Sequence, residues 1–174
     1  MHEDVARLIA QFSLTTLPSE GTLFASTWRS TGNLVDGSPH GTAMIGLFCN
    51  DPLSRSLFHR LPVDEVWHFY AGDPLRLMLL FQDGTARDVV LGPDPLRGHH
   101  VQFVVPAGVW QAGHVVDGGR YALFGCTMAP GFTGSMYEGG LRETLAAQYP
   151  QRAADMRRFG CGSGETSMPA DFAT

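Results

Sequence analysis

The sequence contains no lysine, and all twelve of its basic residues are arginine. This absence excludes Schiff-base catalysis through a protein lysine, which is one of the usual covalent routes on carbonyl compounds. Acidic residues outnumber basic ones, and the net charge is −5. Binding to nucleic-acid phosphates needs a concentrated basic face, so we expect no nucleic-acid partner.

Cysteines and long apolar runs are also scarce. The three cysteines, Cys49, Cys126 and Cys161, are too few and too scattered for a disulfide framework or a zinc ribbon, and we expect buried thiols. Apolar runs such as Leu77–Phe81 are too short to cross a bilayer. The first residues are acidic and lack the basic-then-apolar plan of a signal peptide. We therefore expect a cytoplasmic protein with no membrane partner.

What the chain does contain is a series of short strand-like segments behind one short helix. Apolar residues recur at helical spacing over Asp4–Phe12, which predicts an amphipathic helix packed on the outside of a sheet. The segments suited to strands are Thr22–Arg29, Thr42–Cys49, Arg55–Leu61, Glu65–Ala71, Arg76–Gln82, Ala86–Leu91, Val101–Val105, Trp110–Val115 and Tyr121–Met128. Asp83-Gly84 indicates a hairpin between two of them. Short, regularly spaced strands with no long helix predict an antiparallel sandwich or barrel, and barrel closure removes exposed strand edges.

The end of the chain has a different pattern. Leu141, Leu145 and Tyr149 fall four residues apart, and Pro150 interrupts the pattern, so we expect one or two helices packed on the barrel. We expect residues 1–160 to form a single domain, since the chain is long enough for one core. Residues 161–174 are small and polar, which predicts a disordered tail.

Two stretches resemble the fifth cupin family, whose fold is similar to that of the dTDP-4-dehydrorhamnose 3,5-epimerases. The first runs from Phe58 to Gly72 and includes the string Asp-Glu-Val-Trp-His-Phe-Tyr-Ala-Gly; the second comprises Val105–Gln111 and Tyr121–Phe132. The resemblance spans about Val5 to Tyr149. It implies a mainly all-β fold, the cupin-type double-stranded β-helix or jelly-roll barrel, with a ligand pocket inside. It also implies a homodimer, and the segment Thr42–Cys49, apolar on both faces, suits a strand covered on both sides.

The chain departs from the general cupin pattern at the metal ligands. That pattern is a His-x-His pair, a Glu, a Gly seven residues later and then Pro-x-Gly-x-x-His. Here Glu65 and Gly72 keep their spacing, but Gln111 stands at the late histidine and the early pair is reduced to His59. An amide is a poor ligand for zinc, iron or copper. His59, Glu65 and Gln111 could hold a divalent ion only weakly, so we expect no cofactor, with a divalent metal as the alternative.

The remaining polar groups suggest an organic pocket. If Glu65 points into the barrel, strand alternation sends Trp67 and Phe69 inward as well and His68 outward. His59 is the candidate base and Glu65 the carboxylate that sets its tautomer, although the two could also be a polar pair closing one end of the barrel.

Further candidates complete the expected site. Gln111 suits a hydrogen bond to a ligand oxygen, and Trp67, Phe69 and Trp110 are expected to form the pocket wall. Arg29 and Arg60 are possible anion anchors. For Arg29 a surface position is equally open, whereas strand alternation places Arg60 opposite His59 and favours a surface ion pair. By resemblance to the epimerases, Tyr121 is the candidate acid, and Tyr137 and Glu138 are candidates for a lid. The other histidines, His99, His100 and His114, are expected to be partly exposed.

These residues favour an enzyme acting on a small molecule. The leading hypothesis is a cofactor-independent isomerase or epimerase acting beside a carbonyl of a sugar-like or polyoxygenated metabolite. A metal-dependent cupin oxygenase or lyase is one alternative. A small-molecule binding protein without chemistry is the other.

Overall fold

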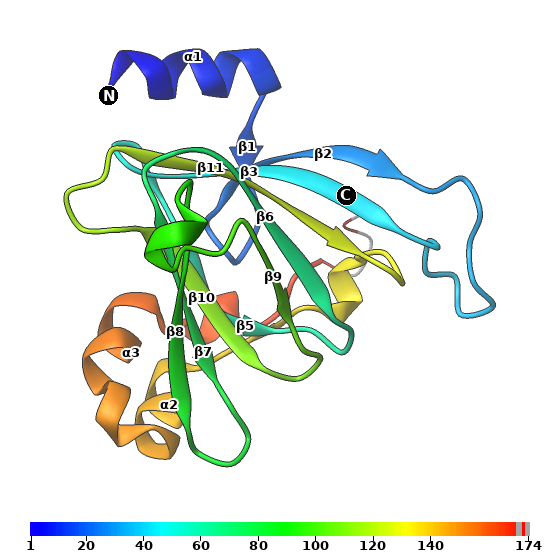
Figure 1. Ribbon diagram of the computed structural model, residues 1–174. Helices are drawn as coiled ribbons and strands as arrows, with labels where there is room; N and C mark the ends of the chain where they lie inside the picture. The colour runs from blue at the N-terminus through cyan, green and yellow to red at the C-terminus, as the bar shows by residue number, and fades with distance from the viewer. Residues whose placement is uncertain (170–171, 173–174) are drawn as a thin grey trace.

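The computed structural model describes residues 1–169 and 172, and its core is built from two antiparallel sheets (Figure 1). The first sheet has the order β1-β2-β3-β11-β6-β9, with β4 paired to β3. Its strands are β1 (Thr15–Thr16), β2 (Leu23–Arg29), β3 (Thr42–Asn50), β4 (Leu53–Ser54), β6 (Glu65–Gly72), β9 (Gln102–Val105) and β11 (Tyr121–Met128). The second sheet has the order β12-β5-β10-β7-β8. Its strands are β5 (Ser56–Arg60), β7 (Leu75–Leu80), β8 (Ala86–Leu91), β10 (Trp110–Val115) and β12 (Glu138–Gly139).

The predicted mainly β, cupin-type jelly-roll fold is confirmed. Each of the nine expected segments forms a strand, and Asp83-Gly84 lies in the turn between β7 and β8, with Gly84 at φ +85°. The strands that sequence reasoning missed are β1, β4 and β12, each of two residues. A segment this short shows no alternation of polar and apolar residues.

Strand alternation divides the apolar side chains between two packing layers. On β7, Leu77 and Leu79 face the core between the sheets, together with Trp67 and Phe124. Met78, between them, faces the opposite side, where the C-terminal helices cover the second sheet. These helices are α2 (Arg142–Gln148) and α3 (Ala153–Phe159), and the 3-10 turns of the chain are η1 (Pro95–Arg97), η2 (Gly134–Met136), η3 (Pro150–Arg152) and η4 (Ser163–Glu165). The expected terminal helices are therefore present.

The N-terminal helix α1 (Glu3–Phe12) lies across the outer face of the first sheet, as expected (Figure 1). Its Val5 is buried against Leu47 of β3 and Leu123 of β11. The apolar outer side of β3 is thus covered at this point by a helix of the same chain, which removes that feature as an argument for a dimer. The dimer itself stays a prediction.

The expected disordered tail is wrong for residues 161–169. Cys161 is fully buried, and the Gly139 N–H donates to the Thr166 carbonyl, which extends the pairing beyond β12. Met168 is buried beside Leu17. The prediction failed because burial here depends on a few apolar residues within a polar stretch. Residues 170, 171, 173 and 174 lie outside the described residues. Within the described part of the chain, no helix is both long and apolar enough to span a membrane.

Candidate functional site

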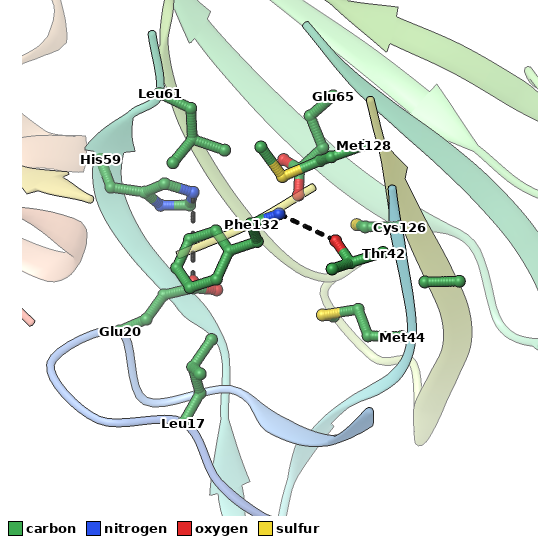
Figure 2. A pocket seen from close by; sticks show the side chains of 11 residues that line it. Leu17, Glu20, Thr42, Met44, His59, Leu61, Glu65, Cys126, Met128 and Phe132 are labelled. Atoms are coloured by element: carbon green, nitrogen blue, oxygen red, sulfur yellow. Dashed lines mark hydrogen bonds and ion pairs between the residues drawn. The ribbon is translucent and has the colours of Figure 1, made fainter. Parts of the chain in front are cut away.

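A small cavity of about 30 Å³ lies between the two sheets, and Figure 2 shows the side chains that converge on it. Its polar lining includes His59, Glu20 and Glu65. The other lining residues are Leu17, Thr42, Ala43, Met44, Leu61, Cys126, Met128 and Phe132. A cavity of this size holds about two water molecules. The wall residues come from strands of both sheets and from the loops that carry Leu17 and Phe132.

His59, on β5, is held so that one ring nitrogen faces the cavity side. Its Nδ1 lies 2.9 Å from the Leu57 carbonyl oxygen and 3.3 Å from Ser56 Oγ. A carbonyl can only accept a hydrogen bond, so this bond assigns the proton to Nδ1. When the ring is neutral, the lone pair is therefore on Nε2, which lies 4.0 Å from Glu20 Oε2. The Tyr137 ring stacks on the imidazole with the centroids 5.4 Å apart, which restrains its orientation.

Glu20 is the functional candidate that sequence reasoning missed. It lies in the loop between β1 and β2 and is buried, and its Oε1 accepts a hydrogen bond of 2.6 Å from Thr22 Oγ1. A buried carboxylate needs such partners. No local pattern marks this residue, because its neighbour His59 lies far along the chain and meets it only through the fold.

Glu65, at the start of β6, belongs to a buried hydrogen-bond triangle. Its Oε2 accepts from Gln111 Nε2 at 2.7 Å and from Trp67 Nε1 at 2.9 Å. The Trp67 N–H is shared with Gln111 Oε1 at 3.0 Å. Glu65 also lines the cavity, where the Cys126 thiol is a further hydrogen-bonding neighbour of its carboxyl group.

Burial sets the electrostatics of this wall. Desolvation raises the pKa of Glu65 above its ordinary value, and the nearby His59 opposes that shift only in part. Burial also raises the pKa of the Cys126 thiol well above its usual range, and the charge of Glu65 adds to this shift. The cavity thus combines a carboxyl group of raised pKa with the imidazole of His59.

The predicted pair of His59 and Glu65 needs correction. Both line the cavity, but the carboxylate facing the His59 ring is Glu20, whereas Glu65 is hydrogen-bonded to Trp67 and Gln111. The cupin pattern pointed to Glu65 because the pattern records spacing along the chain. It carries no information on the loop that brings Glu20 to the ring.

The expected pocket wall is only partly correct. Trp67 points inward as predicted, but Trp67 and Gln111 lie behind Glu65 and do not line the cavity. Phe69 packs against the core. Trp110 is on the other face of its sheet, among the residues under α2 and α3, with the Arg60 guanidinium 4.5 Å from its ring centroid. Adjacent residues on a strand face opposite sides, so Trp110 and Gln111 could not share one pocket.

Three further candidates lie away from the cavity. Arg29 does not line it: its Nη1 donates a hydrogen bond of 3.4 Å to the carbonyl of Phe132, which tethers that loop. Tyr121 packs on the outer face of the first sheet among the residues under α1. Its backbone and ring crowd Gly72, where the φ of +94° and the lack of space both require glycine. His114, expected to be partly exposed, is buried and stacked on Phe159.

Other residues lie where the sequence placed them. His68 points outward, with its Nε2 2.9 Å from Thr127 Oγ1. Arg60 forms a two-pronged ion pair with Glu138, with both nitrogen–oxygen distances 2.7 Å. Tyr137, a lid candidate, is instead buried against the His59 ring and does not line the cavity. The three cysteines are free and buried.

The donors present do not fit a resident metal ion. Within residues 1–169 and 172, no three His, Cys, Asp or Glu side chains gather in a way that could hold one. The Gln111 amide, at the position of the late cupin histidine, is engaged with Glu65 and Trp67. A catalytic metal in a cupin-like site needs about three strong protein ligands. We therefore derive no reaction step through a metal.

Comparison with known proteins agrees with this architecture. A hypothetical protein from Leishmania major is 26% identical, with a TM-score of 0.81, covering 90% of this chain and 98% of that one. A crystallised protein from Shewanella oneidensis is 29% identical, with a TM-score of 0.82, covering 92% of this chain and 98% of that one. No curated protein matches the chain. The family described as "Cupin superfamily (DUF985)" matches residues 6–139. The chain therefore belongs to this family of the cupin superfamily.

Proposed function

We propose that this protein is a cofactor-independent isomerase of small α-hydroxycarbonyl compounds, acting in the cavity of His59, Glu20 and Glu65. The observation that carries the proposal is the meeting of these three groups on one cavity. Titratable groups in different environments around one space are the arrangement that acid–base catalysis uses.

Each group has a distinct role in the proposed reaction. His59 Nε2 removes a proton from the carbon beside the substrate carbonyl, and the Glu20 carboxylate, 4.0 Å away, stabilises the imidazolium. The neutral Glu65 carboxyl donates its proton to the carbonyl oxygen, so the intermediate is an enediol. Glu65 then takes the proton of the neighbouring hydroxyl, and His59 returns its proton to the former carbonyl carbon. All protons are restored at the end of the cycle.

The geometry favours isomerisation over epimerisation. Epimerisation needs a second proton donor on the opposite face of the carbon, and Tyr121, the residue considered for it, packs outside the cavity. A proton shift between neighbouring carbons needs only one base. The cavity of about 30 Å³ is smaller than a sugar, so we propose substrates of few carbons. Phe132 and Leu17 form part of the wall that such a substrate would contact.

The test is proton exchange at carbon, followed by NMR in deuterated water with glycolaldehyde, glyceraldehyde and dihydroxyacetone. We expect exchange with at least one of these substrates, and a loss of about 100-fold or more in His59→Gln. His68→Gln is the matched control, because this histidine is on the outer face of the sheet. Equal exchange by His59→Gln and the unaltered protein would refute the role of His59. A compound that raises the melting temperature but never exchanges would favour the binding-protein alternative.

A further inference from the structure

A second hollow lies beside the cavity. It is a groove of about 390 Å³ between the loop of residues 16–21, the segment around Arg55 and the turn at Gly164 and Glu165. Leu17 and Glu20 line both hollows, so they form the partition between groove and cavity. A volume of this size lies in the range of small-molecule sites.

One arginine, Arg55, lines this groove, and two further arginines, Arg142 and Arg158, lie near it around Phe159 and Gly160. The Arg55 guanidinium carbon lies 5.1 Å from the centroid of the Phe159 ring, and that of Arg158 lies 5.2 Å from the same centroid. Arg142 Nη2 donates a hydrogen bond of 3.2 Å to the carbonyl of Gly160, the next residue. Partial burial lowers the pKa of Arg55, the charges of Arg158 and Arg142 lower it further, and the charge of Glu165 opposes them. Arg158 and Arg142 therefore act on Arg55 as like charges.

Their positive charge is not neutralised by ion pairs within the described residues. No carboxylate there lies within 4.0 Å of the three guanidinium groups, whereas Arg60 and Arg76 each have one. Glu165 also lines the groove, but its Oε2 accepts the Gly162 N–H at 2.7 Å. Apart from the Arg142 bond to Gly160, the hydrogen bonds of the described residues use none of these guanidinium donors. In a chain of net charge −5, such a concentration of unused cationic donors favours an anionic ligand.

We infer that Arg55, Arg142 and Arg158 bind the phosphoryl group of a small phosphate monoester, whose organic part lies in the groove. A phosphate monoester carries close to two negative charges and three acceptor oxygens, which match several guanidinium forks better than one carboxylate does. The groove is larger than a phosphate ion requires, and this leaves room for the organic part. Binding at this site involves no proton transfer at His59. The phosphate-ester site can therefore be tested independently of the proposed isomerase activity.

Calorimetric titration of the full chain at constant ionic strength tests the inference. The probes are glycerol 3-phosphate, inorganic phosphate and uncharged glycerol. We expect glycerol 3-phosphate to bind more tightly than inorganic phosphate, and glycerol not to bind. Arg158→Gln and Arg55→Gln should each weaken phosphate-ester binding about tenfold or more, the loss typical of one charge-assisted hydrogen bond.

Arg157→Gln is the matched control, because Arg157 is the exposed neighbour of Arg158 on α3 and changes the net charge equally. Equal weakening in Arg157→Gln and Arg158→Gln would reduce the effect to general charge and overturn the site. So would absence of phosphate-ester binding at millimolar concentration in the unaltered protein. Equal affinity for inorganic phosphate and the ester would overturn the role of the groove. Arg158 is exposed, so its variant keeps the test valid even if Arg55→Gln fails to fold.

Discussion

Replacing Glu65 by glutamine should change how the stability of the protein depends on pH. The folded state raises the pKa of this carboxyl above its ordinary value, chiefly by burial. Between the ordinary pKa and the folded-state pKa, the folded protein holds a proton that the unfolded chain has released. The free energy of unfolding therefore falls as the pH rises through this window. Glutamine does not titrate, so the variant lacks this loss.

The expected magnitude follows from the hydrogen bonds and from linkage. The glutamine oxygen can still accept from Gln111 and Trp67 in place of Glu65 Oε2. Below the ordinary carboxyl pKa, we expect the two proteins to differ by no more than about 1 kcal/mol. Above the ordinary carboxyl pKa, the free energy of unfolding of the variant should rise relative to that of the unaltered protein by up to about 1.4 kcal/mol per pH unit. The rise should end once the pH passes the folded-state pKa of Glu65.

Urea unfolding followed by tryptophan fluorescence at a series of pH values from 4 to 8 measures this difference. Glu143→Gln is the control, since Glu143 is an exposed carboxylate on α2 and its replacement should leave the pH profile unchanged. A stability difference between Glu65→Gln and the unaltered protein that stays constant with pH would refute the reasoning. A difference that moves in favour of the unaltered protein as the pH rises would refute it as well.

Three other predictions follow from the placement of single residues. Tyr121→Phe should leave any turnover unchanged, because this ring packs under α1, and a large drop in kcat would contradict that assignment. Phe132→Ala should lower the free energy of unfolding by about 2 kcal/mol, since the ring is half-buried, and should accelerate exchange by opening the cavity wall. Denaturant unfolding measures the change in stability, and NMR measures the exchange rate. An unchanged exchange rate would show that the Phe132 ring does not limit entry to the cavity. Light scattering is expected to give the mass of a homodimer, and a monomer mass would contradict that prediction.

Much of the fold could be predicted from local patterns. The alternation of apolar residues located every strand longer than two residues, and the helical spacing of Leu141, Leu145 and Tyr149 located the terminal helices. Prediction was weaker for the tail, where Cys161 and Met168 become buried although their neighbours are polar. Strand parity correctly sent Trp67 inward and His68 outward. The same rule, applied to Trp110 and Gln111 together, would have excluded one of them from the pocket.

The sequence by itself located the strands of an antiparallel sandwich or barrel, because alternation along a single strand is recorded in a linear pattern. Its resemblance to the fifth cupin family implied the jelly-roll architecture and marked Gln111 as standing where cupins have a metal-binding histidine. Only the tertiary structure decided which carboxylate faces His59, because Glu20 reaches the ring from a loop of the first sheet across the space between the sheets. The tertiary structure likewise brought Arg55, Arg142 and Arg158 close to one another near Phe159. Such contacts join segments far apart in the chain, and the packing of the whole domain is what brings them together.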